Sequence, residues 1–156
     1  MKMTINLPAK SAFGANTETV VVKPIGDQHF VVLNVPFVAK GISCGDTVMA
    51  DDERGLLTFR RVISRGGHST YRVFVKTGYR LAEVERLKED LKTGDCEIEV
   101  ATEQLFAIDV LPEADIHRVY ALLDEAEQSG VISDFEEGHC GHEIGERSPF
   151  WSDQEQ

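Results

Sequence analysis

The sequence predicts an α+β fold in which an N-terminal β meander or small open barrel packs on a C-terminal ferredoxin-like βαββαβ unit. Two observations predict it. About the first 65 residues carry β-branched and aromatic segments separated by turn residues, and strand and helix periodicities alternate from Tyr71 to Phe135. A chain of 156 residues is long enough for one compact body and too short for two independent enzymes.

The N-terminal half is expected to consist of strands joined by tight turns. Pro24-Ile25-Gly26-Asp27 has the composition of a turn, and the apolar segments on either side of it predict a β-hairpin. The polar residues 51–55 predict a second turn. Residues 1–17 show no sustained period and are expected to form a short strand or arm followed by a loop. The other strands of this half are expected at residues 19–23, 29–33, 47–50 and 56–63.

The C-terminal half alternates strands with two helices. Apolar residues at helical spacing predict one helix that ends at Gly94 and another that begins after Pro112 and ends at Ser129-Gly130. The nearly continuous apolar segment 105–111 predicts a central strand covered on both faces. In the split βαββαβ arrangement the first and third strands are central, and the second and fourth lie at the edges. The strands are expected at residues 71–76, 96–100, 105–111 and 131–135.

The chain is therefore expected to divide into three parts. An N-terminal β half at residues 1–66 forms one compact body with a ferredoxin-like half at 67–138, and an acidic, flexible tail follows at 139–156. The apolar periodicity stops beyond Gly138, and acidic residues outnumber the single Arg147 from Glu136 onward. Pro149-Phe150-Trp151 is an apolar group within the tail that could dock on the body or on a partner.

The formal net charge of -11 is the most pronounced compositional feature. It argues against direct binding to nucleic acid, because phosphate contacts need clustered Lys and Arg, and it favours encounters with basic partners. No apolar run approaches the roughly 20 residues that cross a bilayer, which predicts a cytoplasmic protein without a membrane partner. Cys44, Cys96 and Cys140 are odd in number and far apart, so they are expected to be reduced thiols.

Three short motifs lie in the first half of the chain: Asn34-Val35-Pro36-Phe37, Gly45-Asp46-Thr47-Val48 and Gly67-His68-Ser69-Thr70-Tyr71-Arg72-Val73. They resemble an uncharacterised bacterial family that is catalogued only as a domain of unknown function. The resemblance extends over most of the chain, from Val20 to Glu137. It brings no established activity and no catalytic residues with it.

The segment from Arg65 to Arg72 is the leading candidate for a small-ligand site. Two glycines expose backbone amides beside an imidazole, hydroxyls and two guanidiniums, a combination that can hold an anion. The alternative is that the glycines only form a bend between the halves. The candidate ligand-binding residues are Arg65, His68, Ser69 and Arg72.

The sequence predicts no metal site and no cofactor. His139, Cys140 and His142 come nearest to a zinc site, but a structural zinc needs four ligands and no second pair of Cys or His is present. Asp109 stands alone in an apolar strand. A buried strand carboxylate either serves as an acid or base or accepts structural hydrogen bonds, and the second role is favoured here.

Because no catalytic motif is visible, the sequence favours a protein-binding function over an enzyme. An acidic, compact domain with edge strands could clamp a basic bacterial protein such as a toxin, as immunity proteins and inhibitors do. The residues expected at that surface are Glu97, Glu99, Glu136 and Glu137. The alternative is an enzyme or small-anion sensor that uses the loop from Arg65 to Arg72 at the seam between the halves.

Overall fold

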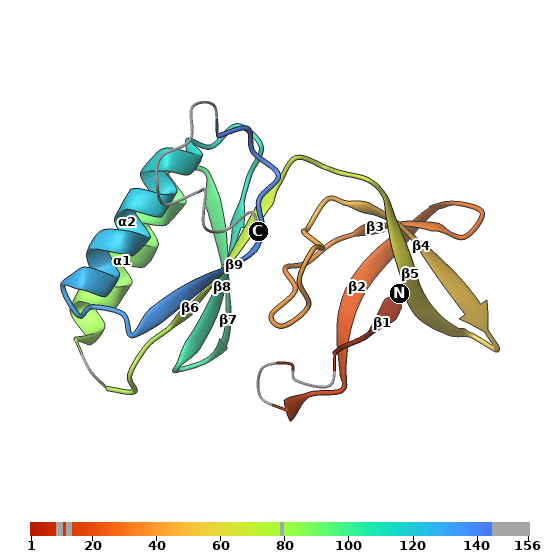
Figure 1. Ribbon diagram of the computed structural model, residues 1–156, viewed down its shortest axis with the longest axis horizontal. Helices are drawn as coiled ribbons and strands as arrows, with labels where there is room; N and C mark the ends of the chain where they lie inside the picture. Colours follow the sequence, from red (N-terminus) through yellow and green to blue (C-terminus); the bar gives the residue numbers. More distant parts are fainter. Residues whose placement is uncertain (9–10, 12–13, 79, 145–156) are drawn as a thin grey trace.

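The computed structural model describes residues 1–8, 11, 14–78 and 80–144 of the chain. They form a β-barrel and a separate sheet, with two helices on the face of the sheet turned away from the barrel (Figure 1). This is the α+β fold that the sequence predicts. The barrel contains β1 (Lys2–Asn6), β2 (Thr17–Gly26), β3 (His29–Val32), β4 (Thr47–Glu53) and β5 (Leu56–Ser64). The second half contains β6 (Ser69–Phe74), α1 (Leu81–Thr93), β7 (Cys96–Thr102), β8 (Leu105–Val110), α2 (Ile116–Gln128) and β9 (Asp134–His139).

The barrel is closed, whereas the sequence predicts a meander or an open barrel. β1 closes it by pairing antiparallel with β2 and parallel with β5, where Met3 lies opposite Leu57. Met3 and Ile5 point into the barrel core, and Lys2 and Asn6 on either side of them are exposed. A strand of 5 residues followed by irregular sequence is too short to show this alternation clearly. Closure gives each strand of the barrel a neighbour on both sides.

The sheet of the second half has the strand order β7-β8-β6-β9, and its pairings are antiparallel. β6 and β8 are therefore central and β7 and β9 lie at the edges, as the sequence predicts. The helices also lie where they are expected. Gly94 follows α1, and the Asp115 side chain caps α2 by accepting backbone N–H bonds from His117 and Arg118. In the described part of the chain, no helix is long and apolar enough to cross a membrane.

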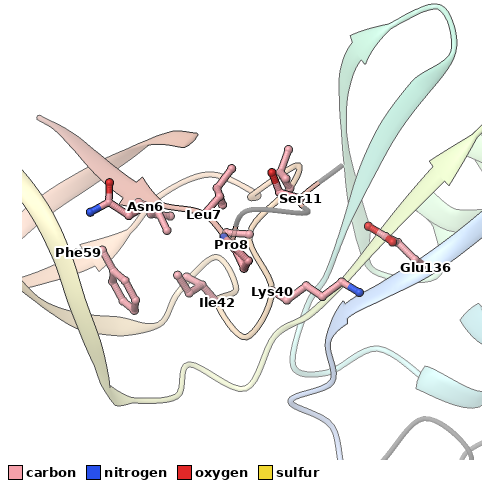
Figure 2. A pocket seen from close by; sticks show the side chains of 11 residues that line it. Asn6, Leu7, Pro8, Ser11, Lys40, Ile42, Phe59 and Glu136 are labelled. Atoms are coloured by element: carbon pink, nitrogen blue, oxygen red, sulfur yellow. The ribbon is translucent and has the colours of Figure 1, made fainter. Parts of the chain in front are cut away.

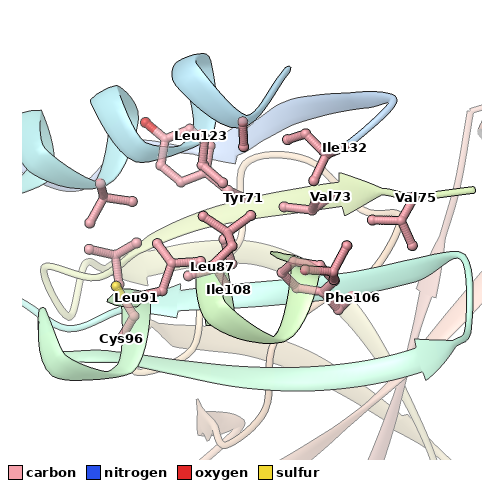
Figure 3. Packing of buried hydrophobic residues seen from close by; sticks show 14 of the residues in the cluster. Tyr71, Val73, Val75, Leu87, Leu91, Cys96, Phe106, Ile108, Leu123 and Ile132 are labelled. Atoms are coloured by element: carbon pink, nitrogen blue, oxygen red, sulfur yellow. The ribbon is translucent and has the colours of Figure 1, made fainter. Parts of the chain in front are cut away.

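Residues alternate along these strands between two different environments. The face under the helices is apolar and forms one core with α1 and α2 (Figure 3). The opposite face is polar and turns toward the barrel (Figure 1). Its side chains come from all four strands: Glu97 and Glu99 on β7, Asp109 on β8, Thr70 and Arg72 on β6, and Glu136 on β9.

β9 begins at Asp134 rather than at Val131, where the sequence predicts it. The backbone N–H groups of Val131 and Ile132 bond to a carbonyl at the end of α2, and the Ile132 side chain is buried in the core under the helices. The strand instead uses Glu136 and Glu137, whose residue type is depleted in strands. Both carboxylates reach buried partners on β6, so tertiary contacts select these residues over local propensity.

The predicted tail begins inside β9, which ends at His139. Cys140 and Ile144 pack against the core under the helices, and His142 bonds to the body of the protein through both ring nitrogens. Residues 140–144 therefore pack on the body, where the sequence places the start of a flexible tail. The rest of the predicted tail, 145–156 with its Pro149-Phe150-Trp151, lies outside the described residues.

Candidate functional site

The loop between β3 and β4 extends from the barrel toward the polar face of the sheet (Figure 1). This loop, the connection between β5 and β6, and the polar side chains beneath them form what we call the seam. Asp46 is fully buried and fixes the seam at one point. Its carboxylate accepts backbone N–H bonds from Ser43 at 2.9 Å and Gly66 at 3.0 Å, and it pairs with Arg65 at 3.0 Å. These partners tie the loop to the connection between β5 and β6.

Arg72 fixes the seam at a second point and has no exposed surface. Its guanidinium donates to the carbonyls of Val38 at 2.7 Å and Ala39 at 3.1 Å, and to Glu136 on β9 at 3.1 Å. Gly138 leaves room for the guanidinium, because a Cβ there would overlap it. A buried charge is tolerated when it is paired and its donors are satisfied, so Arg72 has the surroundings of a structural residue.

The four residues of the predicted anion loop do not converge on one point. Arg65 and Arg72 take part in the two ion pairs described above. Ser69 lies on the other side of the strand, where its hydroxyl is 2.6 Å from Nδ1 of His142. His68 turns toward a carboxylate on β8. The side chains thus belong to separate networks, and an anion held by all four would need these networks to open.

His68 belongs to a cluster with Cys44 and Asp109. Its Nδ1 lies 2.7 Å from Asp109 Oδ1, and the sulfur, an imidazole nitrogen and a carboxylate oxygen of the three residues lie within 4.8 Å of one another. The Asp109 side chain is 3% exposed and that of His68 is 17% exposed, while Cys44 is half-buried, so Asp109 is the member of the cluster most shielded from solvent. Gly45 lies directly under this ring, because a Cβ there would be 2.7 Å from two ring atoms.

Cys44 does not have the surroundings of an enzymatic nucleophile. Burial raises its pKa to about 12, and Asp109 adds to the rise through its charge and a hydrogen bond. A reactive thiol needs a lowered pKa, usually from a neighbouring cation. Asp109 also bonds His68, so a carboxylate lies between the thiol and the imidazole, whereas a catalytic set places the imidazole between the other two. Burial likewise raises the pKa of Cys96 to about 12 and raises that of Cys140.

Two of the predicted zinc candidates, Cys140 and His142, meet at Ser69, whose hydroxyl lies 3.7 Å from the Cys140 sulfur and 2.6 Å from Nδ1 of His142. The ring nitrogens of His142 bond to Ser69 at 2.6 Å and to the carbonyl of Leu111 at 2.8 Å. Cys140 packs against the core under the helices. His139 Nε2 is buried without a hydrogen-bond partner among the described residues, and burial lowers the pKa of this histidine.

The four acidic residues predicted to bind a partner lie at the two edges of the sheet. Glu97 and Glu99 are on β7. The backbone N–H of Val35 bonds to Glu99, while burial raises the pKa of that carboxyl. Glu136 and Glu137 are on β9 and bond to buried side chains of β6. Three of the four therefore also contribute to the fold, and Glu97 is the exposed one.

A cavity of about 660 Å³ lies beside the seam at one end of the barrel (Figure 2). Its volume lies in the range of small-ligand sites, roughly 300–1,000 Å³. Lys40 and Glu136 bring charged groups to the side nearest the sheet (Figure 2). The apolar part of the wall includes Ile5, Leu7, Pro8, Val38, Ile42 and Phe59.

A second hollow of about 370 Å³ adjoins this cavity, because Lys40 and Glu136 line both. We call it the β9 margin. Carboxylates from α2 and β9 face each other across it. Loss of hydration raises the pKa of Glu127, and a hydrogen bond with Asp134 and repulsion from it add to the rise. The β9 margin is lined by Lys40, Tyr120, Asp124, Glu127, Asp134, Phe135, Glu136 and Glu137.

No pattern in the sequence marks Cys44, Asp124 or Glu127 as a site residue. Cys44 comes near His68 and Asp109 only through the packing of the loop on the sheet. Asp124 and Glu127 have the positions of ordinary polar residues on an amphipathic helix. The one local indication of the site is Asp109, because a carboxylate within the apolar strand β8 indicates that one side of this strand is polar.

Residues 18–133 match the family described as "Domain of unknown function (DUF4265)", which confirms the family resemblance seen in the sequence. No curated protein matches the chain. A solved structure described as a hypothetical protein from Neisseria gonorrhoeae is similar, with a TM-score of 0.76 and 17% sequence identity. The similarity covers 90% of this chain and 96% of the other, and it concerns the fold alone.

Proposed function

This chain belongs to that family of domains of unknown function, and from the geometry of its surface we propose that it binds an extended, basic segment of another protein. The observation that carries the proposal is that an apolar cavity and the β9 margin lie side by side, with Lys40 and Glu136 lining both. One partner segment could place an apolar side chain in the cavity and Lys or Arg side chains in the margin. Interfaces of this kind combine a buried apolar anchor with complementary charge.

Electrostatics support a basic partner. The chain carries a formal net charge of -11, and the carboxylates of Asp124, Glu127 and Asp134 line one hollow. Loss of hydration is the first cause of the raised pKa of Glu127, and repulsion from Asp134 and Asp124 adds to it; an incoming Lys or Arg would offset that repulsion. Attraction of this kind speeds association and is screened over about 10 Å at 0.1 M salt.

The backbone at the β9 margin supports an extended partner. β9 is an edge strand, paired with β6 on one side. An extended segment can add to such an edge through main-chain hydrogen bonds while its side chains enter neighbouring pockets. The seam covers the far end of β9, where Gly41 N–H donates to Gly138 at 2.9 Å. The part of β9 that begins at Asp134 lies beside the margin.

A labelled peptide with one Leu followed by alternating Lys and Arg tests the proposal by fluorescence anisotropy. We expect Asp124→Lys combined with Glu127→Lys to weaken binding tenfold or more, which is about 1.4 kcal/mol, because both carboxylates line the same hollow. Replacing the Leu of the peptide with Asp should weaken binding as well, since the cavity next to the margin is apolar. The affinity should fall as the salt concentration rises.

The matched control is Glu103→Lys combined with Glu113→Lys. It changes the net charge by the same amount at two exposed positions that line neither hollow. If the control weakens binding as much as the margin variant, the attraction belongs to the net charge and the β9 margin is not the site. A wild-type protein that does not bind the peptide also contradicts the proposal.

We further propose that the second half is a ferredoxin-like unit, which the strand order β7-β8-β6-β9 supports. The partner would be a basic bacterial protein such as a toxin, met in the cytoplasm, and the free thiols Cys44, Cys96 and Cys140 are consistent with that compartment. The alternative of an enzyme or anion sensor at the loop from Arg65 to Arg72 has less support, because the side chains of this loop have separate partners.

A further inference from the structure

We propose that Cys44, His68 and Asp109 bind a zinc ion in the seam, apart from the β9 margin. The three side chains supply a sulfur, a nitrogen and an oxygen within 4.8 Å of one another. Zinc takes these donor types in a tetrahedral arrangement, and a site with three protein ligands holds water as the fourth. The sequence predicts no metal because these ligands come from three distant segments: the β3–β4 loop, the β5–β6 connection and β8.

The donor atoms need only small movements to reach zinc-binding distances. Zn–N and Zn–O bonds of about 2.0–2.2 Å at a tetrahedral angle place the nitrogen and oxygen roughly 3.4 Å apart. His68 Nδ1 and Asp109 Oδ1 are 2.7 Å apart. The same geometry places the sulfur and nitrogen roughly 3.6 Å apart, inside the 4.8 Å that contains the cluster. Side-chain rotations that move the donor atoms about 1 Å are therefore enough to bring them to zinc-binding distances.

The backbone around the cluster holds the ligands in place. Asp46 ties the loop that carries Cys44 to the connection that carries His68. Gly45, with a φ of +86°, lies under the imidazole, since a Cβ there would be 2.7 Å from two ring atoms. A Cβ on Gly66 would overlap the Gly45 carbonyl, so the two segments are in direct contact. A metal site benefits from ligands whose supporting residues are fixed in this way.

Negative charge gathers around the cluster. Glu97 lies opposite Asp109 in the register of β7 and β8, and Glu99 follows on the same face. The nearby guanidiniums of Arg65 and Arg72 have carboxylate partners of their own. A divalent cation stabilises a thiolate and the neighbouring carboxylates together, so these surroundings favour a metal over a free nucleophile.

Two other roles for the cluster account for fewer of its features. A nucleophilic cysteine would need the imidazole next to its sulfur, and here Asp109 hydrogen-bonds both groups. A structural His68–Asp109 hydrogen bond explains the imidazole but gives no role to Cys44. Zinc binding uses all three side chains.

Cobalt(II), added to the metal-free full-length protein, tests the site by absorption spectroscopy. We expect equimolar binding, ligand-field bands of a tetrahedral site and a thiolate-to-cobalt charge-transfer band. Cys44→Ser should remove the charge-transfer band and lower zinc affinity by about 100-fold or more. Cys140→Ser is the matched control, because this thiol lies in separate surroundings, and it should change neither property.

Imidazole NMR of the wild-type protein keeps the test independent of how well the variants fold. On addition of zinc, the ring nitrogen signals of His68 should shift, and those of His29 and His117 should not. Three results overturn the proposal: no equimolar binding, a cobalt complex without a thiolate band, or a band that disappears in Cys140→Ser and persists in Cys44→Ser.

Discussion

The seam and the β9 margin differ in how their charged groups are matched. In the seam, Arg72 is paired with Glu136 and Arg65 with Asp46. In the β9 margin, carboxylates face one another, and the pKa of Glu127 is raised. Buried charges that are paired fix the positions of the segments that carry them, whereas like charges gathered at a surface favour an incoming cation. The matching of charges, more than their total, thus distinguishes the contacts of Arg72 and Asp46, which hold the fold, from groups of unmatched carboxylates, which can bind a cation.

Removing a paired charge from the seam should have the largest effect on the free energy of unfolding. Arg72→Ala leaves Glu136 and three backbone carbonyls without this donor and should lower the free energy of unfolding by about 3–5 kcal/mol. Urea denaturation measures this change. Arg61→Ala, at an exposed position of β5, is the control and should stay within about 0.5 kcal/mol of wild type. A similar, small loss in both variants would show that buried pairing does not hold the seam together.

Two glycines with nearly equal backbone angles allow a finer test of the seam. Gly45 and Gly55 have φ values of +86° and +87°, but a Cβ meets the His68 ring at Gly45 and nothing within 4 Å at Gly55. Gly55→Ala should cost about 1–2 kcal/mol for the backbone alone. Gly45→Ala should cost roughly 1–3 kcal/mol more, because the new methyl group displaces the imidazole. Thermal or urea unfolding that gives equal losses would mean that the ring is not held against Gly45.

The smallest effect on stability is expected from a substitution in the β9 margin. The pKa of Glu127 is raised above its ordinary value of 4.5. Its protonated form therefore stabilises the fold below about pH 4.5, and this contribution is lost as the pH rises through the higher pKa of the folded state. Glu127→Gln should gain stability relative to wild type as the pH rises from about 4 to 7. A difference that is constant over this range would show that the carboxylates of the margin do not repel one another.

The sequence predicts the strands and helices well where the pattern is local. The apolar β8 and the alternating β7 differ enough in composition to be placed at the centre and at an edge of the sheet. β9 was placed too early, because Glu136 and Glu137 become strand residues through their partners on β6. β1 was not recognised as the strand that closes the barrel, because its pairing with β5 joins segments far apart in the chain.

The candidate sites were predictable only in part, for the same reason. His68 and Asp109 stand out in the sequence, one beside two glycines and the other within an apolar strand. Nothing local connects either of them to Cys44, which reaches them through the packing of one loop on the polar face of the sheet. Asp124 belongs to the β9 margin only because α2 lies beside the edge strand β9.

An amide NMR titration of the isotope-labelled, full-length protein with the Leu-containing basic peptide tests most directly whether the β9 margin is the binding surface. We predict shifts concentrated at residues that line the cavity and the margin, including Lys40, Tyr120 and Phe135. Signals from the exposed face of α1 and from Glu97 on β7 should stay unchanged. Shifts spread evenly over the exposed acidic residues of α1 and β7, or no shifts at all, would contradict the assignment of binding to the β9 margin.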